Sequence, residues 1–145
     1  MRKRTHAREC VLQILYQHEM NPLPLGQVME SFWKENEGQE EEVKSFAAGL
    51  VLGTRLHQGE IDEVIKKVTN NWDLGRMAVI DRSILRFATY ELLFMEDIPS
   101  KVTINEAVNL AKKFSQEGSG KFVNGILDKI SHTEKSRVEK KAEHE

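Results

Sequence analysis

Basic side chains are concentrated at the start of the chain, which opens MRKRTHAREC. Arg2, Lys3, Arg4 and Arg8 are four of its 21 basic residues, and no acid lies among the first eight positions. The rest of the chain holds 17 basic and 23 acidic residues, so the positive charge is segregated. Guanidinium groups pair bidentately with phosphate oxygens, and segregated charge of this kind indicates a polyanionic partner such as nucleic acid. An end that only keeps the protein in solution is the alternative.

Two aromatic residues could stack on a nucleic-acid base. Tyr16 lies about three helical turns after Thr5, near the edge of the helix that would carry the basic residues. Phe122 directly follows a glycine-rich break. A ring that stacks on a base contributes roughly 1–3 kcal/mol. Either residue could instead be structural, and the residues alone favour the core for Phe122 because it fits the apolar stripe of the last helix.

The glycine-rich break reads GSGK over residues 118–121 and invites comparison with a phosphate-binding loop. That motif requires Ser or Thr where Phe122 stands, and a strand where the preceding segment has helical periodicity. A weaker prediction survives: Ser119 caps a helix whose first turn, with Lys121, forms a general anion site. A simple turn between helices is the alternative.

The chain lacks the constellations of an enzyme. Its five histidines are scattered and its single cysteine, Cys10, lies on an apolar helical stripe, so we predict a buried structural thiol and no metal or cofactor site. One cysteine excludes an internal disulfide, and no apolar run is long enough for a membrane span or a signal peptide. We therefore expect a soluble cytoplasmic protein without catalytic activity.

Apolar residues recur at helical spacing along nearly the whole chain, and no segment has the period of a strand. The pattern predicts an all-α fold of about seven helices. The segment 75–96 is apolar over a wide face and is expected to lie at the centre of the core. Thr103 and Glu106 have the spacing of a capping box and predict the start of a helix.

One domain is predicted over residues 1–131. An interruption around residues 70–76 suggests two helical sub-bundles that share one core, at about 1–70 and 71–131. Residues 132–145 lose the apolar pattern and are expected to form a disordered charged tail.

Four motifs in order resemble the NusB family of bacterial transcription antitermination factors, over about residues 3–131. They are AREC.LQ.LY from Ala7, DRSILRFATYEL from Asp81, IPSKVTINEAVNLAKKFS from Ile98 and KFVNGILDKI from Lys121. The resemblance implies two three-helix sub-bundles and binding of boxA, a single-stranded RNA element of ribosomal RNA leaders. It also implies a partner, the ribosomal protein NusE, and a complex with RNA polymerase. Some members of the family form homodimers, and the sequence leaves that state open.

The resemblance also assigns roles to individual residues. It implies RNA contacts by Arg2, Lys3, Arg4, Arg8, Tyr16, Ser119, Lys121 and Phe122, and so reverses the core assignment of Phe122. It implies that Asp81, with Arg76 nearby, faces the protein partner. The residues themselves leave Asp81 open, because an acid in the first turn also stabilises a helix.

Arg82 and Arg86 lie four residues apart on one helical face, where their like charges repel unless an anionic group is near. We expect internal acids, such as Glu91 or Glu106, rather than an external ligand.

Two other functions remain as alternatives. One is a protein-only helical adaptor in ribosome or transcription assembly, with the basic start merely solvated. The other is an accessory domain for RNA modification, which the absence of a glycine-rich cofactor motif and of a second domain disfavours.

Overall fold

The structure is a computed structural model that describes residues 2–134. Within that range it has seven α-helices, one short 3-10 helix and no strand, so the predicted all-α fold is confirmed. The predicted tail falls mostly on residues 135–145, which lie outside the described residues. No helix between residues 2 and 134 is both long enough and apolar enough to cross a lipid bilayer. The elements are α1 (Lys3–Met20), α2 (Leu25–Glu35), α3 (Glu41–Leu56), α4 (Gln58–Val68), η1 (Leu74–Arg76), α5 (Val79–Phe94), α6 (Ser100–Phe114) and α7 (Ser119–Thr133).

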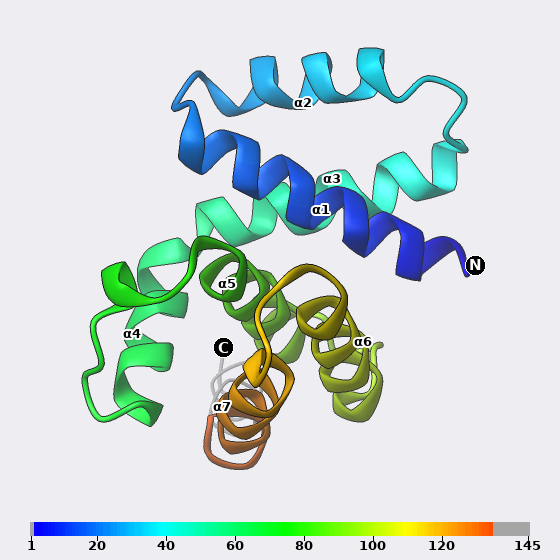
Figure 1. Cartoon of the computed structure of the whole chain (residues 1–145). Helices are drawn as coiled ribbons and strands as arrows, with labels where there is room; N and C mark the ends of the chain where they lie inside the picture. Colours follow the sequence, from blue (N-terminus) through cyan, green and yellow to red (C-terminus); the bar gives the residue numbers. More distant parts are fainter. Residues whose placement is uncertain (1, 135–145) are drawn as a thin grey trace, which may run out of the picture.

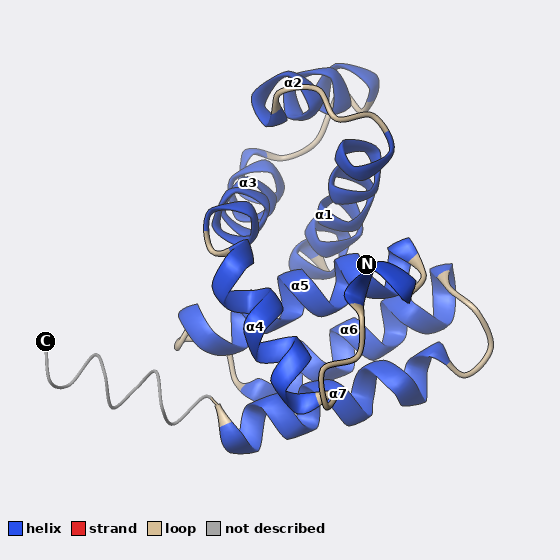
Figure 2. Ribbon diagram, turned by 90° about the vertical axis from the view of Figure 1, so that its left-hand side faces the viewer, coloured by secondary structure: helices blue, strands red, loops and turns tan. Residues whose placement is uncertain are grey.

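The helices form two groups that meet at α5. Helices α1, α2 and α3 pack together, and α4, α6 and α7 surround α5 (Figures 1 and 2). Only His57 separates α3 from α4, yet α4 packs mainly against α5 and α7. The division predicted near residue 70 would put α4 in the first group, whereas its contacts put it in the second. The chain turns at His57, and Gly59 follows two residues later.

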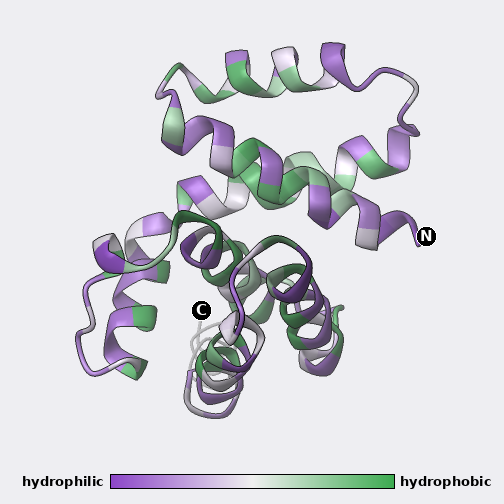
Figure 3. Ribbon diagram, viewed as in Figure 1, coloured by the Kyte–Doolittle hydropathy of each residue, from purple (hydrophilic) through white to green (hydrophobic). Residues whose placement is uncertain are grey.

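A single apolar core joins the two groups. Every helix contributes buried apolar residues to it, and hydrophobic positions alternate with hydrophilic ones along the helices (Figure 3). Helix α5 has most of its 16 residues buried, which confirms its predicted central place. The buried face of α1 packs on α5 as well as on α3, so the helix that carries the basic start is held by both groups.

The capping box predicted at Thr103 and Glu106 is wrong. Helix α6 begins one turn earlier, at Ser100 after Pro99, which supplies a preset backbone angle for a helix start. The Thr103 hydroxyl instead donates to Glu91 Oε1 at 2.9 Å, and Glu106 Oε1 accepts from the Thr5 hydroxyl at 2.7 Å. Both side chains therefore link helices rather than end one.

Arg86 has internal partners, as expected for the Arg82–Arg86 pair. Its guanidinium donates to both carboxylate oxygens of Asp62 on α4, at 2.9 and 3.1 Å, and to Glu19 on α1 at 2.6 Å. Arg82 lies 3.8 Å from Glu19 as well. The partners differ from the suggested Glu91 and Glu106, because α4 and the end of α1 converge on this side of α5.

Candidate nucleic-acid interface

The first turn of α1 places three cations at the surface. Arg2 is exposed and makes no ion pair with any residue between 2 and 134, and Arg4 is exposed as well. Lys3 Nζ lies 2.9 Å from Glu40 and 3.0 Å from Glu42, just before and at the start of α3. Hydrogen bonds to Glu40 and then Glu42 raise the pKa of Lys3 above its ordinary value. Arg2 and Arg4 are therefore the cations of this turn that are open to an external anion.

Arg8 is buried, with 2% of its surface exposed. Its Nε and Nη2 donate to the two carboxylate oxygens of Glu91 at 2.8 and 2.7 Å, and Thr103 donates to the same carboxylate. The Phe46 ring lies 5.2 Å below the Arg8 guanidinium and 4.6 Å from that of Arg4. In this structure one edge of the Arg8 guanidinium is occupied by Glu91, and Nη1 lies 3.8 Å from Glu106, so the side chain ties α1 to α5 and α6. The RNA contact expected of Arg8 stays a prediction.

Three hollows border α1, α6 and the turn into α7, and the last turn of α6 reaches all of them. Lys113 lines a cavity of about 440 Å³ beside Arg2 and the start of α1. Lys112 lines one of about 420 Å³ at the α6–α7 turn, together with Lys121. Phe114 lines a smaller one of about 190 Å³. The first of these hollows meets the start of α1, and the second meets the start of α7.

Tyr16 stands at the smallest of these hollows. It is 40% exposed and lines the cavity with Leu12, Ile80 and Phe114. The ring therefore has an apolar wall on one side and solvent on the other. That arrangement fits both readings of the sequence, a rim residue and a surface on which a flat group can stack.

Asp81 and Ser119 are buried together under the α6–α7 turn. Asp81 Oδ1 accepts from the Ser115 hydroxyl at 2.6 Å, and Oδ2 accepts from that of Ser119 at 3.1 Å. Asp81 is 7% exposed and Ser119 is 5% exposed. Both side chains are therefore engaged inside the protein, and the partner contact of Asp81 and the RNA contact of Ser119 stay predictions. The N-cap of α7 is Gly118, whose φ of 90° favours glycine, so Ser119 is not the cap that the sequence predicted. The Ser119 hydroxyl binds Asp81 instead.

Lys121 and Phe122 follow on the first turn of α7. Lys121 is exposed and Phe122 is half-buried against the core. The Phe122 ring meets Trp72 edge to face, with ring centroids 5.2 Å apart. Trp72 is 47% exposed and was missed from the sequence, although a tryptophan in a polar break between helices is a usable signal. Arg76, at the end of η1, is exposed and makes no ion pair within residues 2–134.

The single cysteine of the chain belongs to the core. Cys10 is buried, as predicted, and burial raises its pKa to about 11, so the nucleophilic thiolate is scarce near neutral pH. Within residues 2–134 no three His, Cys, Asp or Glu side chains gather closely enough to hold a metal ion.

Comparison with known proteins gives one consistent result. The model of the NusB family matches residues 5–132. A protein named Transcription antitermination protein NusB from Thermodesulfovibrio yellowstonii is 48% identical over 141 residues, covering 91% of this chain and 93% of that protein. A protein of the same name from Anaeromyxobacter dehalogenans is 48% identical over 129 residues, covering 89% and 90%.

Solved structures share the arrangement of helices. NusB of T. maritima superposes with a TM-score of 0.82 at 41% identity, covering 90% of this chain and 91% of that one. A structure described as the antitermination factors NusB and NusE in complex with dsRNA gives a TM-score of 0.83 at 29% identity, covering 91% and 98%.

Proposed function

Because the chain belongs to the NusB family, we propose that it is an RNA-binding transcription antitermination factor. It binds boxA-type single-stranded RNA together with the ribosomal protein NusE, as part of the RNA polymerase complex on ribosomal RNA operons. The observation that carries the proposal is 48% identity, over nearly the whole chain, to proteins named for antitermination. The protein acts by binding, without catalysis, in the cytoplasm where transcription takes place.

The proposed RNA surface runs from the start of α1 to the start of α7. Arg2, Arg4 and Lys121 supply cations for phosphates, and Tyr16 and Phe122 supply rings for bases. The support is the exposure of the three cations and of Tyr16, and the hollows that these four residues line. Phe122 is half-buried and directly follows Lys121. Each cation that engages a single strand should add about 0.7 to the slope of log affinity against log salt, so these three give roughly −2. Lys3 can contribute a fourth phosphate contact only if its ion pairs with Glu40 and Glu42 are broken.

An unpaired strand suits this surface better than a duplex. A ring can stack on a base only if that base is not already stacked and paired. Tyr16 is exposed on α1, and Phe122 is half-buried on the first turn of α7 with Trp72 against its ring. We expect a duplex of the same sequence to use only the cations, and therefore to bind more weakly.

The partner surface includes Arg76. It is exposed and unpaired within the described range, so it can meet an acidic group of NusE. Asp81 contributes indirectly, because its hydrogen bonds to Ser115 and Ser119 fix the α6–α7 turn and so position Lys121 and Phe122. Loss of Asp81 should therefore weaken RNA binding indirectly.

Fluorescence anisotropy of a labelled boxA-like single strand, with and without NusE, tests the proposal. Phe122→Ala and Tyr16→Ala should each weaken binding by roughly 5- to 150-fold, which corresponds to about 1–3 kcal/mol of stacking. Leu56→Ala is the matched control, because it removes an exposed apolar side chain, 79% exposed, from α3. It should bind RNA like the parent.

Other outcomes identify the alternatives. Binding of NusE without any affinity for RNA would indicate the protein-only adaptor. Equal affinity of the parent and both aromatic variants would contradict the stacking assignment. Sedimentation of the same samples establishes whether the free protein is a monomer or a homodimer.

A further inference from the structure

The loop between α4 and η1 presents an exposed tryptophan on a fixed backbone. Asn70 and Asn71 both have left-handed backbone angles, with φ of 55° and 64°. Asn71 N donates to Lys66 O at 2.6 Å, and Trp72 N donates to Thr69 O at 3.3 Å. A left-handed conformation costs a residue other than glycine roughly 1–2 kcal/mol, and asparagine tolerates it best. The loop is thus shaped by its own hydrogen bonds and directs Trp72 toward α7.

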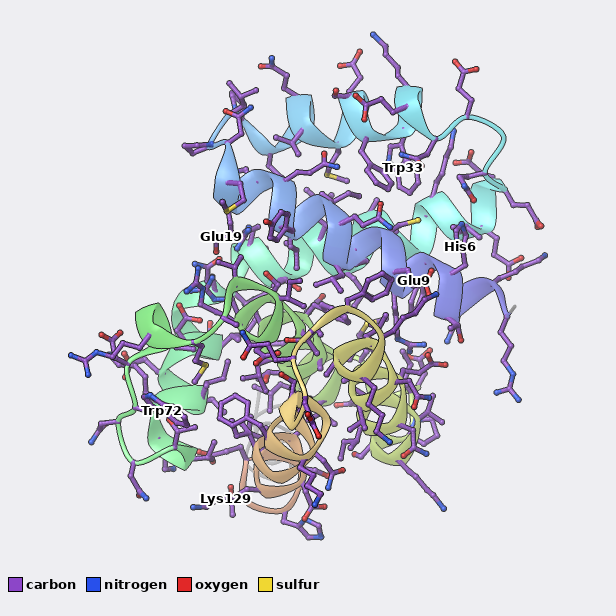
Figure 4. All side chains as sticks on the ribbon, in the orientation of Figure 1. His6, Glu9, Glu19, Trp33, Trp72 and Lys129 are labelled. Carbon is purple, nitrogen blue, oxygen red and sulfur yellow. The ribbon has the colours of Figure 1, made fainter. Side chains whose placement is uncertain are left out.

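Trp72 is held against Phe122 yet leaves much of its ring in water. The two ring planes are 80° apart, an edge-to-face contact, and Trp72 remains 47% exposed. Figure 4 shows Trp72 beside α4, toward α7. Tryptophan gains most from full burial, so a ring that served only as a cover would be expected to bury more of its surface. The exposed part of the indole is a flat aromatic surface next to the ring already proposed for RNA.

The surroundings of this ring pair favour an anionic ligand. Lys121 directly precedes Phe122 and Arg76 follows Trp72 by four residues, and neither makes an ion pair within residues 2–134. The nearest acid in sequence, Asp73, has one carboxylate oxygen accepting from Gly75 N at 2.8 Å, which reduces its repulsion of phosphate. A Cβ added at Gly125, one turn along α7 from Phe122, would meet nothing within 4 Å, so the space there is open.

We propose that Trp72 provides a second stacking surface, on which an unpaired RNA base rests beside the base held by Phe122. The inference rests on the proposed function and adds a residue to the same site. Because the ring planes are 80° apart, bases on the two rings cannot stack on each other, so the strand bends between them. A duplex cannot make that bend without unpairing, which gives the site its preference for a single strand.

Tryptophan fluorescence tests the inference directly. The chain has two tryptophans, and Trp33 on α2 packs against Phe32, so Trp33→Phe leaves Trp72 as the only emitting indole. Titration of this variant with a boxA-like single strand should quench the emission, while its affinity stays that of the parent. Trp72→Ala should weaken binding by roughly 5- to 150-fold, and Trp72→Phe by less because it keeps a ring.

The inference about Trp72 can be refuted while the proposed function stands. If the parent binds RNA but Trp72 emission does not change and both Trp72 variants bind equally well, Trp72 is only a structural cover. A lower melting temperature of Trp72→Ala with unchanged RNA affinity leads to the same conclusion. Loss of NusE binding alone would make Trp72 a protein contact and would also overturn the inference. Absence of RNA binding by the parent, with and without NusE, would instead refute the proposed function.

Discussion

Replacement of Arg8 separates a structural role from an RNA contact. Arg8→Ala removes the cation that pairs with Glu91, whose side chain is 1% exposed. The Thr103 hydroxyl would remain as a donor to that carboxylate, at 2.9 Å. A buried carboxylate that loses its cation is poorly compensated by one neutral hydrogen bond, so we expect the folded state to be strongly destabilised.

The size of the effect follows from known buried pairs. Breaking such a pair by removing one partner costs about 3–5 kcal/mol, against a total stability of roughly 5–15 kcal/mol for a domain. With a urea dependence of about 2 kcal/mol/M, the unfolding midpoint should fall by roughly 2 M. Arg8→Met with Glu91→Leu removes both charges and should recover much of the loss.

Urea unfolding followed by circular dichroism measures these differences, and the RNA salt slope is measured on the same variants. Arg2→Ala is the matched control, because Arg2 is an exposed arginine one helical turn and a half earlier. It should change stability by less than about 0.5 kcal/mol and reduce the magnitude of the salt slope by about 0.7. The folded double variant at Arg8 and Glu91 should keep the parent's salt slope.

The opposite pattern would refute the reasoning. An Arg8→Ala variant with nearly unchanged stability and a smaller salt slope would mean that the arginine leaves Glu91 and reaches phosphate. The buried Arg8–Glu91 pair would then exist only in the RNA-free protein.

Three further predictions concern packing and titration. Gly53→Ala should destabilise by about 1–3 kcal/mol in urea unfolding, because its Cβ would overlap the Tyr90 ring, whereas Gly49→Ala on the same helix has open space and should be neutral or stabilising. The pKa of Cys10 is raised from 9.0 to about 11 in the folded protein, so the contribution of Cys10 to the free energy of unfolding should be constant below pH 9 and be lost as the pH rises toward 11. Cys10→Ala should flatten the fall in stability over that range, and a steeper profile in the variant would contradict this prediction. Asp81→Ala removes the acceptor of the half-buried Ser115 hydroxyl and one of two acceptors of the buried Ser119 hydroxyl, and should cost about 1–3 kcal/mol together with some RNA affinity. Unchanged unfolding would show that the α6–α7 turn does not need this anchor.

The helices were predictable because their apolar residues repeat at helical spacing. Proline and glycine breaks marked most of their ends, but the grouping of α4 depends on its packing against α5 and α7, which no break in the sequence reveals. Burial of Cys10 followed from its place on an apolar stripe. In each case the relevant information was local to one helix.

The roles of the polar residues were harder to predict from the sequence, because their partners lie far away along the chain. Arg8 was assigned to RNA from its charge, but its partner Glu91 is 83 residues distant. Ser119 resembled a cap, but its hydroxyl bonds Asp81 across 38 residues. Trp72 gave no periodic signal at all, since it lies in a loop whose shape depends on two asparagines.

The end of α6 constrains how this molecule can change. Lys112, Lys113 and Phe114 point in directions about 100° apart, and each lines a different hollow. Inserting or deleting one residue within α6 would rotate this trio by the same angle, so a lysine would face the Tyr16 wall and the ring would face solvent. Insertions and deletions in this family should therefore be found in the connections between helices rather than within α6. Substitutions within α6 do not rotate the helix and are not restricted in this way.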